Sequence, residues 1–400
     1  MRGERIGVVG AGAMGAGIAQ VAASGGMDVV LNDPDGRALA EGIDRLNAGI
    51  SGARERGELS EEQAREASER VARGEDLGAL RGCTIVIEAA PERLDVKREL
   101  FARLEAICGD EAILATNTSS LSVTAIAAGA DRPQRIVGMH FFNPPTRMKL
   151  VEVIAGDESS EFALDASTAI AEAMGRTPIR ARDSVGFVAN RCARPFTLES
   201  LRMLGEGVAR HDEIDRVCRL GGGFRMGAFE LMDLIGIDVN LAVARSFFDQ
   251  SFGEPRWRPH PIQQRMVDSG RLGRKSGRGF YAYGEGLHRD DDPDLDPDAE
   301  RPVLGERELE RVAGPLGPVV LVRIAAQIAN EGCFALAEDV ASAADIDTAM
   351  RLGFNWPLGP LEWGERLGWP RALETLDELR ELHGEAYRPA PLLREKAAAG

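Results

Sequence analysis

Cysteine is scarce in this chain, and none of it is arranged in pairs. The 400 residues contain five cysteines, scattered along the chain at Cys83, Cys108, Cys192, Cys218 and Cys333. Their number is odd and no two form a CxxC motif, so neither a disulfide framework nor a zinc or other metal site is expected. Unpaired cysteines are typical of a reducing compartment, and we therefore expect a cytoplasmic protein.

An excess of positive charge is also missing. The formal net charge is −16 and the isoelectric point is near 5.0. Proteins that bind a nucleic-acid backbone or an anionic membrane surface do so through clustered lysine and arginine. We expect neither partner, and an anionic substrate would have to be held by a local basic pocket.

The chain lacks a long hydrophobic run as well, because no stretch reaches the roughly 18 apolar residues that a membrane span needs. The first 26 residues superficially resemble a signal peptide, since two arginines precede an apolar stretch that ends in small residues. Glycines interrupt that stretch at Gly7, Gly10, Gly12, Gly15 and Gly17. We therefore expect neither a signal peptide nor a membrane span.

The N-terminal part alternates strand and helix patterns. Short apolar strands are predicted at residues 5–10, 28–33, 84–88, 112–116, 136–140 and 150–154. Helical patterns lie between them, for example at residues 14–23 and 92–107. This alternation predicts an α/β domain of the Rossmann type, with a doubly wound and mostly parallel sheet.

From Gly186 onward the pattern is helical only, beginning with a long helix that should be kinked near Pro195. Residues 288–302 are acidic and rich in proline, as expected of a solvated linker. The expected domains are a dinucleotide-binding domain, a first helical domain, an acidic linker and a second, truncated helical domain, at residues 1–184, 185–285, 286–310 and 311–400.

The two helical stretches are related by a constant offset of 132 residues. This offset aligns GAFELMDLIGID at 227–238 with GPLEWGERLGWP at 359–370, and DEIDRV at 212–217 with ADIDTA at 344–349. It also pairs Arg191 with Arg323, Glu199 with Glu331 and Gly236 with Gly368. A single register over this span indicates a duplicated all-α domain.

A GxGxxG motif, Gly10-Ala11-Gly12-Ala13-Met14-Gly15, lies between a predicted strand and a predicted helix. In that context the glycines permit a tight turn, the approach of a pyrophosphate and close packing of helix on strand. Asp33 closes the second strand and is placed to accept hydrogen bonds from a ribose, which favours NAD over NADP. The alternative is a structural glycine turn with a surface aspartate.

Of the five histidines, four stand in polar or proline-flanked segments: His211, His260, His288 and His383. His140 instead closes an apolar strand, where side chains of an open sheet line the ligand crevice. Glu152 lies between two valines in a later strand, so burying its carboxylate would require a partner such as an imidazole. The alternatives are a satisfied core histidine and a glutamate that faces solvent.

Several motifs in order resemble the L-3-hydroxyacyl-CoA dehydrogenase family. They are GAGAMGAGIAQVAA, EAAPERLDVKRELF, NTSSLS, GMHFFNPPTRMKLVEVI, DSVGFVANR and KSGRGFYAY, spread over residues 5–283. The later helical repeat is similar to the second copy of the helical domain in long bacterial members. The resemblance implies NAD-dependent oxidation of an L-3-hydroxyacyl-CoA to the 3-ketoacyl-CoA, in fatty-acid β-oxidation, butanoate or aromatic-degradation metabolism.

The resemblance also implies roles for individual residues. His140 would be the catalytic base, Glu152 its partner, and Ser119 and Asn190 would bind the substrate oxygen. Ser119 is chosen over Ser120 by its spacing to His140. Asn47 and Arg54 fall where the family contacts coenzyme A, although Arg54 replaces the usual lysine. The implied cofactor-binding residues are Gly10, Gly12, Ala13, Met14, Gly15, Asp33, Glu92, Lys97, Asn117 and Asn143.

The chain departs from the family pattern at two places. RMGAFE at 225–230 replaces the usual PMGPFE, which should only adjust a helix connection. The second copy has Val322 where the first has Asn190, so one active site per chain is implied. We expect the two copies to pack together within one chain, which could still form a homo-oligomer through another surface.

Three other functions are compatible with parts of the sequence. A dehydrogenase of the same family could act on a free hydroxy acid, such as a sugar acid or carnitine. A non-catalytic relative could bind NAD alone, but all four implied catalytic residues are present. An unrelated Rossmann dehydrogenase with helical repeats would not account for HFFNP or GFVANR.

Overall fold

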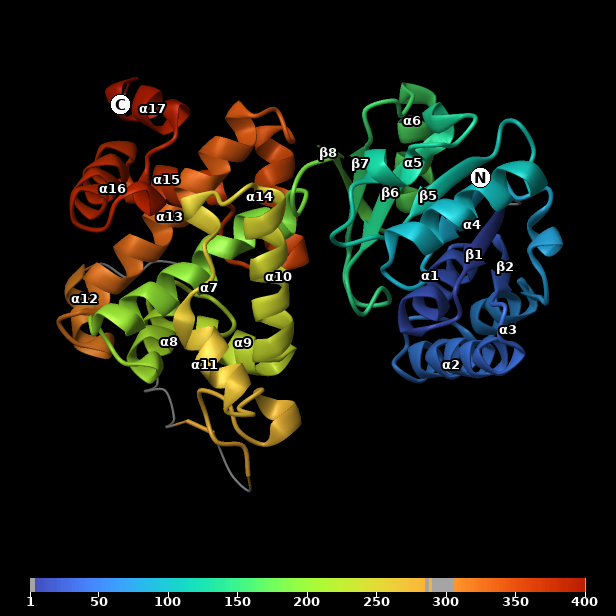
Figure 1. The fold of residues 1–400 in the computed structure, drawn as a ribbon. Helices are drawn as coiled ribbons and strands as arrows, with labels where there is room; N and C mark the ends of the chain where they lie inside the picture. Colours follow the sequence, from blue (N-terminus) through green and yellow to red (C-terminus); the bar gives the residue numbers. More distant parts are fainter. Residues whose placement is uncertain (1–3, 285–287, 290–305, 400) are drawn as a thin grey trace. The chain divides into compact units, whose positions relative to one another are not determined.

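The computed structural model describes residues 4–284, 288–289 and 306–399. The chain separates into two compact units, Met1–Phe187 and Val188–Gly400. Each unit is described by itself (Figure 1). Most of the acidic segment that the sequence predicts to be a linker lies outside the described residues.

The first unit contains an eight-stranded sheet in the order β3-β2-β1-β4-β5-β6-β7-β8. The strands are β1 (Arg5–Val9), β2 (Asp28–Asn32), β3 (Val71–Gly74), β4 (Ile85–Glu88), β5 (Ile113–Thr116), β6 (Ile136–Phe141), β7 (Leu150–Ala155) and β8 (Thr177–Arg182). Strands β1 to β6 are parallel, β7 is antiparallel to β6, and β8 is parallel to β7. The mostly parallel, doubly wound sheet predicted from the sequence is confirmed.

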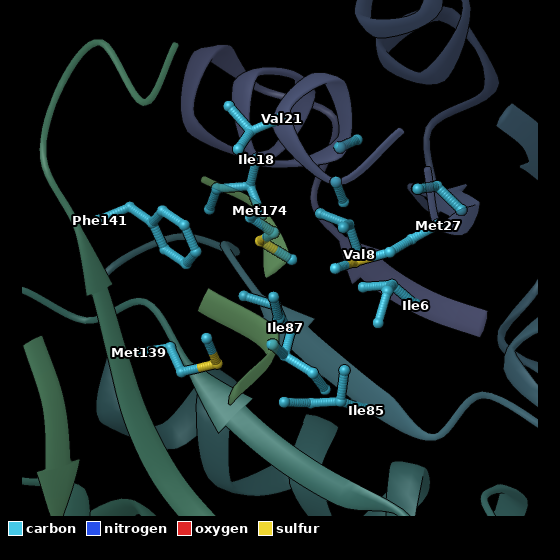
Figure 2. Packing of buried hydrophobic residues seen from close by; sticks show 14 of the residues in the cluster. Ile6, Val8, Ile18, Val21, Met27, Ile85, Ile87, Met139, Phe141 and Met174 are labelled. Atoms are coloured by element: carbon cyan, nitrogen blue, oxygen red, sulfur yellow. The ribbon is translucent and has the colours of Figure 1, made fainter. Parts of the chain in front are cut away.

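Helices cover both faces of this sheet. They are α1 (Ala13–Ser24), α2 (Gly36–Glu55), α3 (Glu61–Glu69), α4 (Leu94–Ile107), α5 (Val123–Ala127) and α6 (Glu161–Ala173), with short 3-10 turns at Leu77–Leu80 and Pro133–Arg135. Helices α1, α2, α3 and α6 share one hydrophobic core with the sheet. Figure 2 shows Ile18 of α1 in one cluster with Val8, Ile87 and Phe141, which come from three different strands.

Alternation along the strands separates this core from the polar side chains. The core takes every second residue, such as Val8, Ile87 and Met139. Neighbouring positions point to the opposite face because side chains alternate with a period of two. The buried polar residues of the strands share that opposite face: Glu88, Thr116, His140 and Glu152. The polar groups of the candidate site therefore gather on one side of the sheet.

The second unit is helical throughout its described residues, apart from isolated bridges at residues 273–282. Its helices are α7 (Ala189–Glu206), α8 (His211–Leu220), α9 (Ala228–Ile235), α10 (Ile237–Gln250), α11 (Pro261–Asp268), α12 (Glu306–Ala313), α13 (Gly317–Ala337), α14 (Ala343–Gly353), α15 (Pro360–Leu367), α16 (Trp369–His383) and α17 (Pro391–Ala399). Short 3-10 turns lie at Pro255–Trp257, Arg274–Ser276 and Glu385–Tyr387. Pro195 lies inside α7, which begins at Ala189, three residues later than the sequence pattern indicates.

Helix α13 is long and apolar enough to cross a membrane by length and composition. However, 83% of its most apolar window is buried inside the protein. It packs against α7 and α15 in the second unit. Its hydrophobic character is therefore that of a central core helix.

The duplication seen in the sequence appears in the second unit as exchanged ion pairs. Arg191 on α7 binds Glu331 on α13, with Nε 2.7 Å from Oε1. Arg323 on α13 binds Glu199 on α7, also with Nε 2.7 Å from Oε1. Arg191 and Arg323 occupy equivalent positions in the two copies, and so do Glu199 and Glu331. The arginine of each copy thus binds the glutamate of the other copy. This reciprocity is typical of an isologous contact between two equivalent surfaces.

Candidate active site

His140 and Glu152 face each other across two neighbouring strands. The antiparallel register of β6 and β7 pairs His140 directly with Glu152. The His140 Nδ1 atom lies 2.6 Å from Glu152 Oε2. Both side chains are buried, and Glu152 has no exposed surface. The sequence predicted that the buried carboxylate would need an imidazole partner, and the two side chains are in contact.

This contact fixes the orientation of the imidazole. An ionised carboxylate can only accept hydrogen bonds, so Nδ1 carries a proton and donates a hydrogen bond to Glu152. Nε2 is then the ring nitrogen that remains for chemistry. The ring also packs against Phe142 and Phe187, with centroids 4.5 and 5.8 Å away. A histidine held by a carboxylate on one side and by aromatic rings on another has the geometry of a general base.

The glycine-rich turn joins β1 to α1 at the carboxyl edge of the sheet. Gly10 has a φ of +98°, and a Cβ there would lie 2.5 Å from the Ala89 carbonyl oxygen. A Cβ at Gly15 would lie 1.7 Å from the Gly10 carbonyl oxygen. By contrast, a Cβ at Gly12 would meet nothing within 4 Å. Two glycines therefore permit the tight packing of the turn, while the third leaves open space at its surface.

The start of α1 offers an anion-binding position. Gly12 is its N-cap and provides no side chain to accept hydrogen bonds from the first turn. The first N–H groups of a helix carry partial positive charge and bind phosphate when no cap covers them. With Ala13 and Met14 in that first turn, these residues fit the pyrophosphate of a dinucleotide.

Asp33 follows β2 and contacts the glycine-rich turn. Its Oδ2 accepts a hydrogen bond from the Ala11 N–H at 2.8 Å, and its Oδ1 accepts one from the Asp35 N–H at 3.0 Å. A carboxylate can accept about four hydrogen bonds, so capacity remains for the hydroxyls of a ribose. The side chain is half-buried at the edge of the dinucleotide position.

Glu92 organises the loop that contains Ser119. Its Oε1 accepts hydrogen bonds from Thr118 Oγ1 at 2.6 Å, the Ser119 N–H at 3.0 Å and Ser120 Oγ at 3.0 Å. Burial would raise the pKa of Glu92, but the bond from Thr118 and the charge of Lys97 outweigh it and hold that pKa below its usual value. The sequence placed Glu92 beside the cofactor. Its role in shaping the loop could not be read from the motif.

Glu88 is a buried polar residue that the sequence analysis missed. The Lys97 Nζ lies 2.6 Å from Glu88 Oε1 and 3.3 Å from Glu92 Oε2. Glu88 Oε2 also accepts a hydrogen bond from Thr116 Oγ1 at 2.7 Å. The available signal was a carboxylate at the end of an apolar strand, since such a residue is costly to bury alone. Glu88 fixes Lys97, which the sequence assigned to the cofactor.

The remaining predicted residues lie in different parts of the chain. Asn117 follows β5, and its Oδ1 accepts a hydrogen bond from the Phe141 N–H at 2.8 Å, next to His140. Asn143 is exposed just after β6. Asn47 and Arg54 are exposed on α2, seven residues apart and so on the same side of the helix. Asn190 lies in the first turn of α7, in the second unit.

The fold and these groups define a class of protein. A doubly wound sheet with a glycine-rich turn, an open helix N-terminus and an acid after β2 is a dinucleotide-binding domain. A histidine and carboxylate pair near the carboxyl edge of the sheet adds an acid–base group. Together they define a Rossmann-type dehydrogenase.

Comparison with known proteins identifies the family. The NAD-binding domain of 3-hydroxyacyl-CoA dehydrogenase matches residues 5–184, and the C-terminal domain of that family matches residues 186–283 and 319–400. A 3-hydroxyadipyl-CoA dehydrogenase of Escherichia coli K12 is 38% identical over 98% of this chain and 97% of its own. A probable 3-hydroxybutyryl-CoA dehydrogenase of Bacillus subtilis is 42% identical over 70% of this chain and 98% of its own.

A solved structure agrees with these relatives. The crystal structure of 3-hydroxybutyryl-CoA dehydrogenase from Escherichia coli K12 matches with a TM-score of 0.89 and 37% identity, covering 100% of this chain and 99% of that one. The chain belongs to the 3-hydroxyacyl-CoA dehydrogenase family and is an NAD-dependent oxidoreductase. The family and the cofactor predicted from the sequence are confirmed.

Proposed function

We propose that this enzyme oxidises the 3-hydroxyl of an L-3-hydroxyacyl-CoA to the 3-ketoacyl-CoA, with His140 as general base and Glu152 as its partner. The observation that carries the proposal is the buried contact of 2.6 Å between His140 Nδ1 and Glu152 Oε2. It leaves His140 Nε2 to accept a proton from the substrate. The names of the relatives, 3-hydroxyadipyl-CoA and 3-hydroxybutyryl-CoA dehydrogenase, support a thioester of coenzyme A as the substrate.

The proposed chemistry divides between proton and hydride. NAD, when bound, supplies the acceptor for the hydride of carbon 3. His140 Nε2 takes the proton of the 3-hydroxyl as the ketone forms, and the imidazole becomes positively charged. Glu152 stabilises that charge through Nδ1 and keeps the ring oriented. In the reverse direction, the same imidazolium returns the proton to the ketone oxygen.

Ser119 and Asn190 would hold the substrate oxygen while its charge develops. The choice of Ser119 over Ser120 is supported by their hydroxyls, because Ser120 Oγ donates to Glu92. Ser119 is exposed, and only its backbone N–H bonds to Glu92. Asn190 would contribute from the start of α7.

The cofactor and coenzyme A would be held by separate groups. Gly10, Gly12, Gly15 and the first turn of α1 would bind the pyrophosphate, and Asp33 the adenosine ribose. The residues proposed to lie along the nicotinamide half are Glu92, Lys97, Asn117 and Asn143. Asn47 and Arg54, on the exposed face of α2, would contact coenzyme A.

The principal rival is a dehydrogenase of a free hydroxy acid, and the thioester discriminates between the two. The test is NADH oxidation with acetoacetyl-CoA and a series of longer 3-ketoacyl-CoAs, each compared with the matching free acid. We expect turnover of thioesters only. Turnover of a free acid with none of any thioester would favour the rival, and absence of turnover with every substrate would favour a non-catalytic relative.

We further propose that the chain has four domains, with boundaries near residues 185, 286 and 311. We also propose that the enzyme acts in fatty-acid, butanoate or aromatic-degradation metabolism.

A cytoplasmic location is supported by the five cysteines, which are buried and form no disulfide bond. Fractionation of cells that express the tagged chain tests the location, since recovery outside the cytoplasmic fraction would exclude it.

A further inference from the structure

Arg194 on α7 is a buried cation for which the described residues provide no anion. Its relative exposure is 6%, and its Nε and Nη1 atoms have no hydrogen-bond partner among the described residues. The guanidinium carbon lies 5.6 Å from the centroid of the Phe247 ring of α10. Burial lowers the pKa of Arg194 to about 10, so the side chain remains charged at neutral pH.

An unpaired buried guanidinium is costly. Taking a charged group out of water is strongly unfavourable unless a partner and hydrogen bonds compensate. A contact with an aromatic ring compensates only part of that cost. A packed structural role would be served better by an uncharged side chain of the same size, because such replacements are often neutral or stabilising.

The other buried arginine in the first half of α7, Arg191, has carboxylate partners. Arg191, three residues earlier, binds Glu331 and Glu338 with nitrogen–oxygen distances of 2.7 Å to each. Arg194 has no such carboxylate among the described residues. The difference indicates that the anion for Arg194 comes from a bound molecule.

The position of Arg194 on α7 says which part of a molecule that anion belongs to. It stands four residues after Asn190, which is about 6 Å further along the helix and about 40° around it. The two side chains therefore emerge from the same side of α7. If Asn190 holds the oxygen on carbon 3, then Arg194 lies one turn of α7 away from the residue that holds that oxygen.

We propose that Arg194 binds the terminal carboxylate of a dicarboxylic 3-hydroxyacyl-CoA and so selects that substrate class. A guanidinium presents a planar fork of donors that matches a carboxylate in two parallel hydrogen bonds. In a six-carbon dicarboxylic chain, three bonds separate carbon 3 from the terminal carboxyl carbon, a span of about 3.8 Å when extended. The side chains of Asn190 and Arg194 are long enough to span the difference between this length and the rise of one helical turn.

The proposal rests on the proposed function, because it takes the acyl chain to start at Asn190. The terminal carboxylate would pair with the charge of Arg194, and an acyl chain without that carboxylate offers no such anion. A 3-hydroxybutyryl or 3-hydroxyhexanoyl group would leave Arg194 buried without an anion. Such substrates should therefore be poor ones.

The experiment compares two ketoacyl thioesters of equal carbon number with NADH at neutral pH. 3-Oxoadipyl-CoA carries the terminal carboxylate, and 3-oxohexanoyl-CoA has a methyl group in its place. We expect kcat/KM of the wild-type enzyme to favour 3-oxoadipyl-CoA by at least about 100-fold, the discrimination expected of a site built around a polar group. A ratio near one in the wild-type enzyme overturns the inference without any variant.

Arg194→Met then tests the residue. It removes the charge and keeps most of the volume, so the ratio should fall to within about tenfold of one, while turnover of 3-oxohexanoyl-CoA persists or rises. Arg194→Lys keeps a charge without the fork and should retain part of the preference. The matched control is Arg202→Met, on the same helix, because Arg202 already pairs with Glu199 and should leave the ratio unchanged.

Each other outcome is decisive. Equal losses with both thioesters in Arg194→Met would mean that Arg194 binds a phosphate of coenzyme A or serves the fold, and would overturn the inference. An unchanged ratio would also overturn it. Absence of turnover of every thioester by the wild-type enzyme would instead contradict the proposed function itself. If Arg194→Met does not fold, the wild-type ratio and Arg194→Lys still decide.

Discussion

At the scale of single residues, function depends on which oxygen or nitrogen of a side chain is already bonded. His140 uses Nδ1 for Glu152, and Ser120 uses its hydroxyl for Glu92. In the proposed reaction, these commitments leave His140 Nε2 and the Ser119 hydroxyl for the substrate. We therefore expect the Ser120 hydroxyl and His140 Nδ1 to position the site, and the Ser119 hydroxyl and His140 Nε2 to contact the substrate.

The two serines allow this division to be tested. Ser119→Ala should lower kcat/KM for acetoacetyl-CoA by about 100-fold, because it removes a donor to the developing charge on oxygen. Ser120→Ala should lower it by less than about tenfold, because the Ser120 hydroxyl donates to Glu92. Steady-state kinetics of both variants provides the comparison. The reverse order of effects would assign the substrate contact to Ser120.

The position of Asp33 predicts a preference for NAD over NADP. A carboxylate at the end of β2 repels the 2′-phosphate of NADP, so NAD should be preferred by at least about 100-fold in kcat/KM. Steady-state kinetics with both cofactors measures the preference. Comparable efficiency with NADP would mean that Asp33 does not face the ribose and serves only the Ala11 and Asp35 N–H groups.

Sequence reasoning reached the contact between His140 and Glu152 but not its surroundings. Glu152 could be paired with His140 because a carboxylate between two valines needs a partner, and the chain has few histidines. Glu88 was missed because nothing along the sequence indicates that Lys97, nine residues later, returns to it. Arg194 could not be singled out either, because two of its buried nitrogens lack a hydrogen-bond partner among the described residues, and this is visible only in three dimensions.

At the scale of elements, one prediction concerns how a helix start is capped by another helix. Asp215 on α8 accepts hydrogen bonds from the Phe229 and Glu230 N–H groups in the first turn of α9, both at 2.9 Å. The N-cap Gly227 offers no side chain, and a Cβ there would lie 2.1 Å from Asp215 Cγ. Asp347 and Leu361 repeat the contact in the second copy at 2.8 Å.

Asp215→Ala should therefore lower the free energy of unfolding by about 1–3 kcal/mol, the cost of leaving buried N–H groups without acceptors. Burial raises the pKa of Asp215 to about 7, although its hydrogen bonds oppose that rise. Denaturant unfolding followed by circular dichroism measures the loss. Asp212→Ala is the control, because Asp212 forms an exposed ion pair worth at most about 1 kcal/mol. Equal stability of both variants would contradict the capping role.

Element prediction succeeded for the parallel strands and failed at the edges of the sheet. β3 and β8 were not predicted, because β3 (VARG) is partly exposed and carries an arginine and a glycine, and β8 carries a proline and two arginines. The antiparallel direction of β7 was also not predicted. The eight-residue connection between Phe141 and Leu150 was the available signal, since a parallel crossover needs about a dozen residues or more.

At the scale of the whole molecule, the duplicated helical copies act as each other's partner. The exchanged pairs continue beyond the glutamates already described, because Arg191 also binds Glu338 and Arg323 also binds Glu206. Glu338 and Glu206 are again 132 residues apart. The constant offset predicted a duplicated domain and the packing of its copies within one chain, and α7 and α13 do pack together. The exchange of partners could not be read from the sequence.

Removing the second copy should therefore expose a surface made for a partner. A chain ending at about residue 300 would lose Glu331 and Arg323 and uncover the buried face of α7. We expect this fragment to self-associate or aggregate, because large exposed apolar surfaces do so. Light scattering measures the outcome. A fragment that stays a stable, soluble monomer would contradict this role of the second copy.

The central claim is that the buried His140–Glu152 pair moves the proton of a 3-hydroxyacyl-CoA. The most direct measurement is the rate of NADH oxidation with acetoacetyl-CoA by the wild-type enzyme, His140→Gln and Glu152→Gln, together with the NADH dissociation constant of each. We predict that both variants lose at least about 100-fold in turnover while NADH affinity changes little. Near-normal turnover of either variant would contradict the claim.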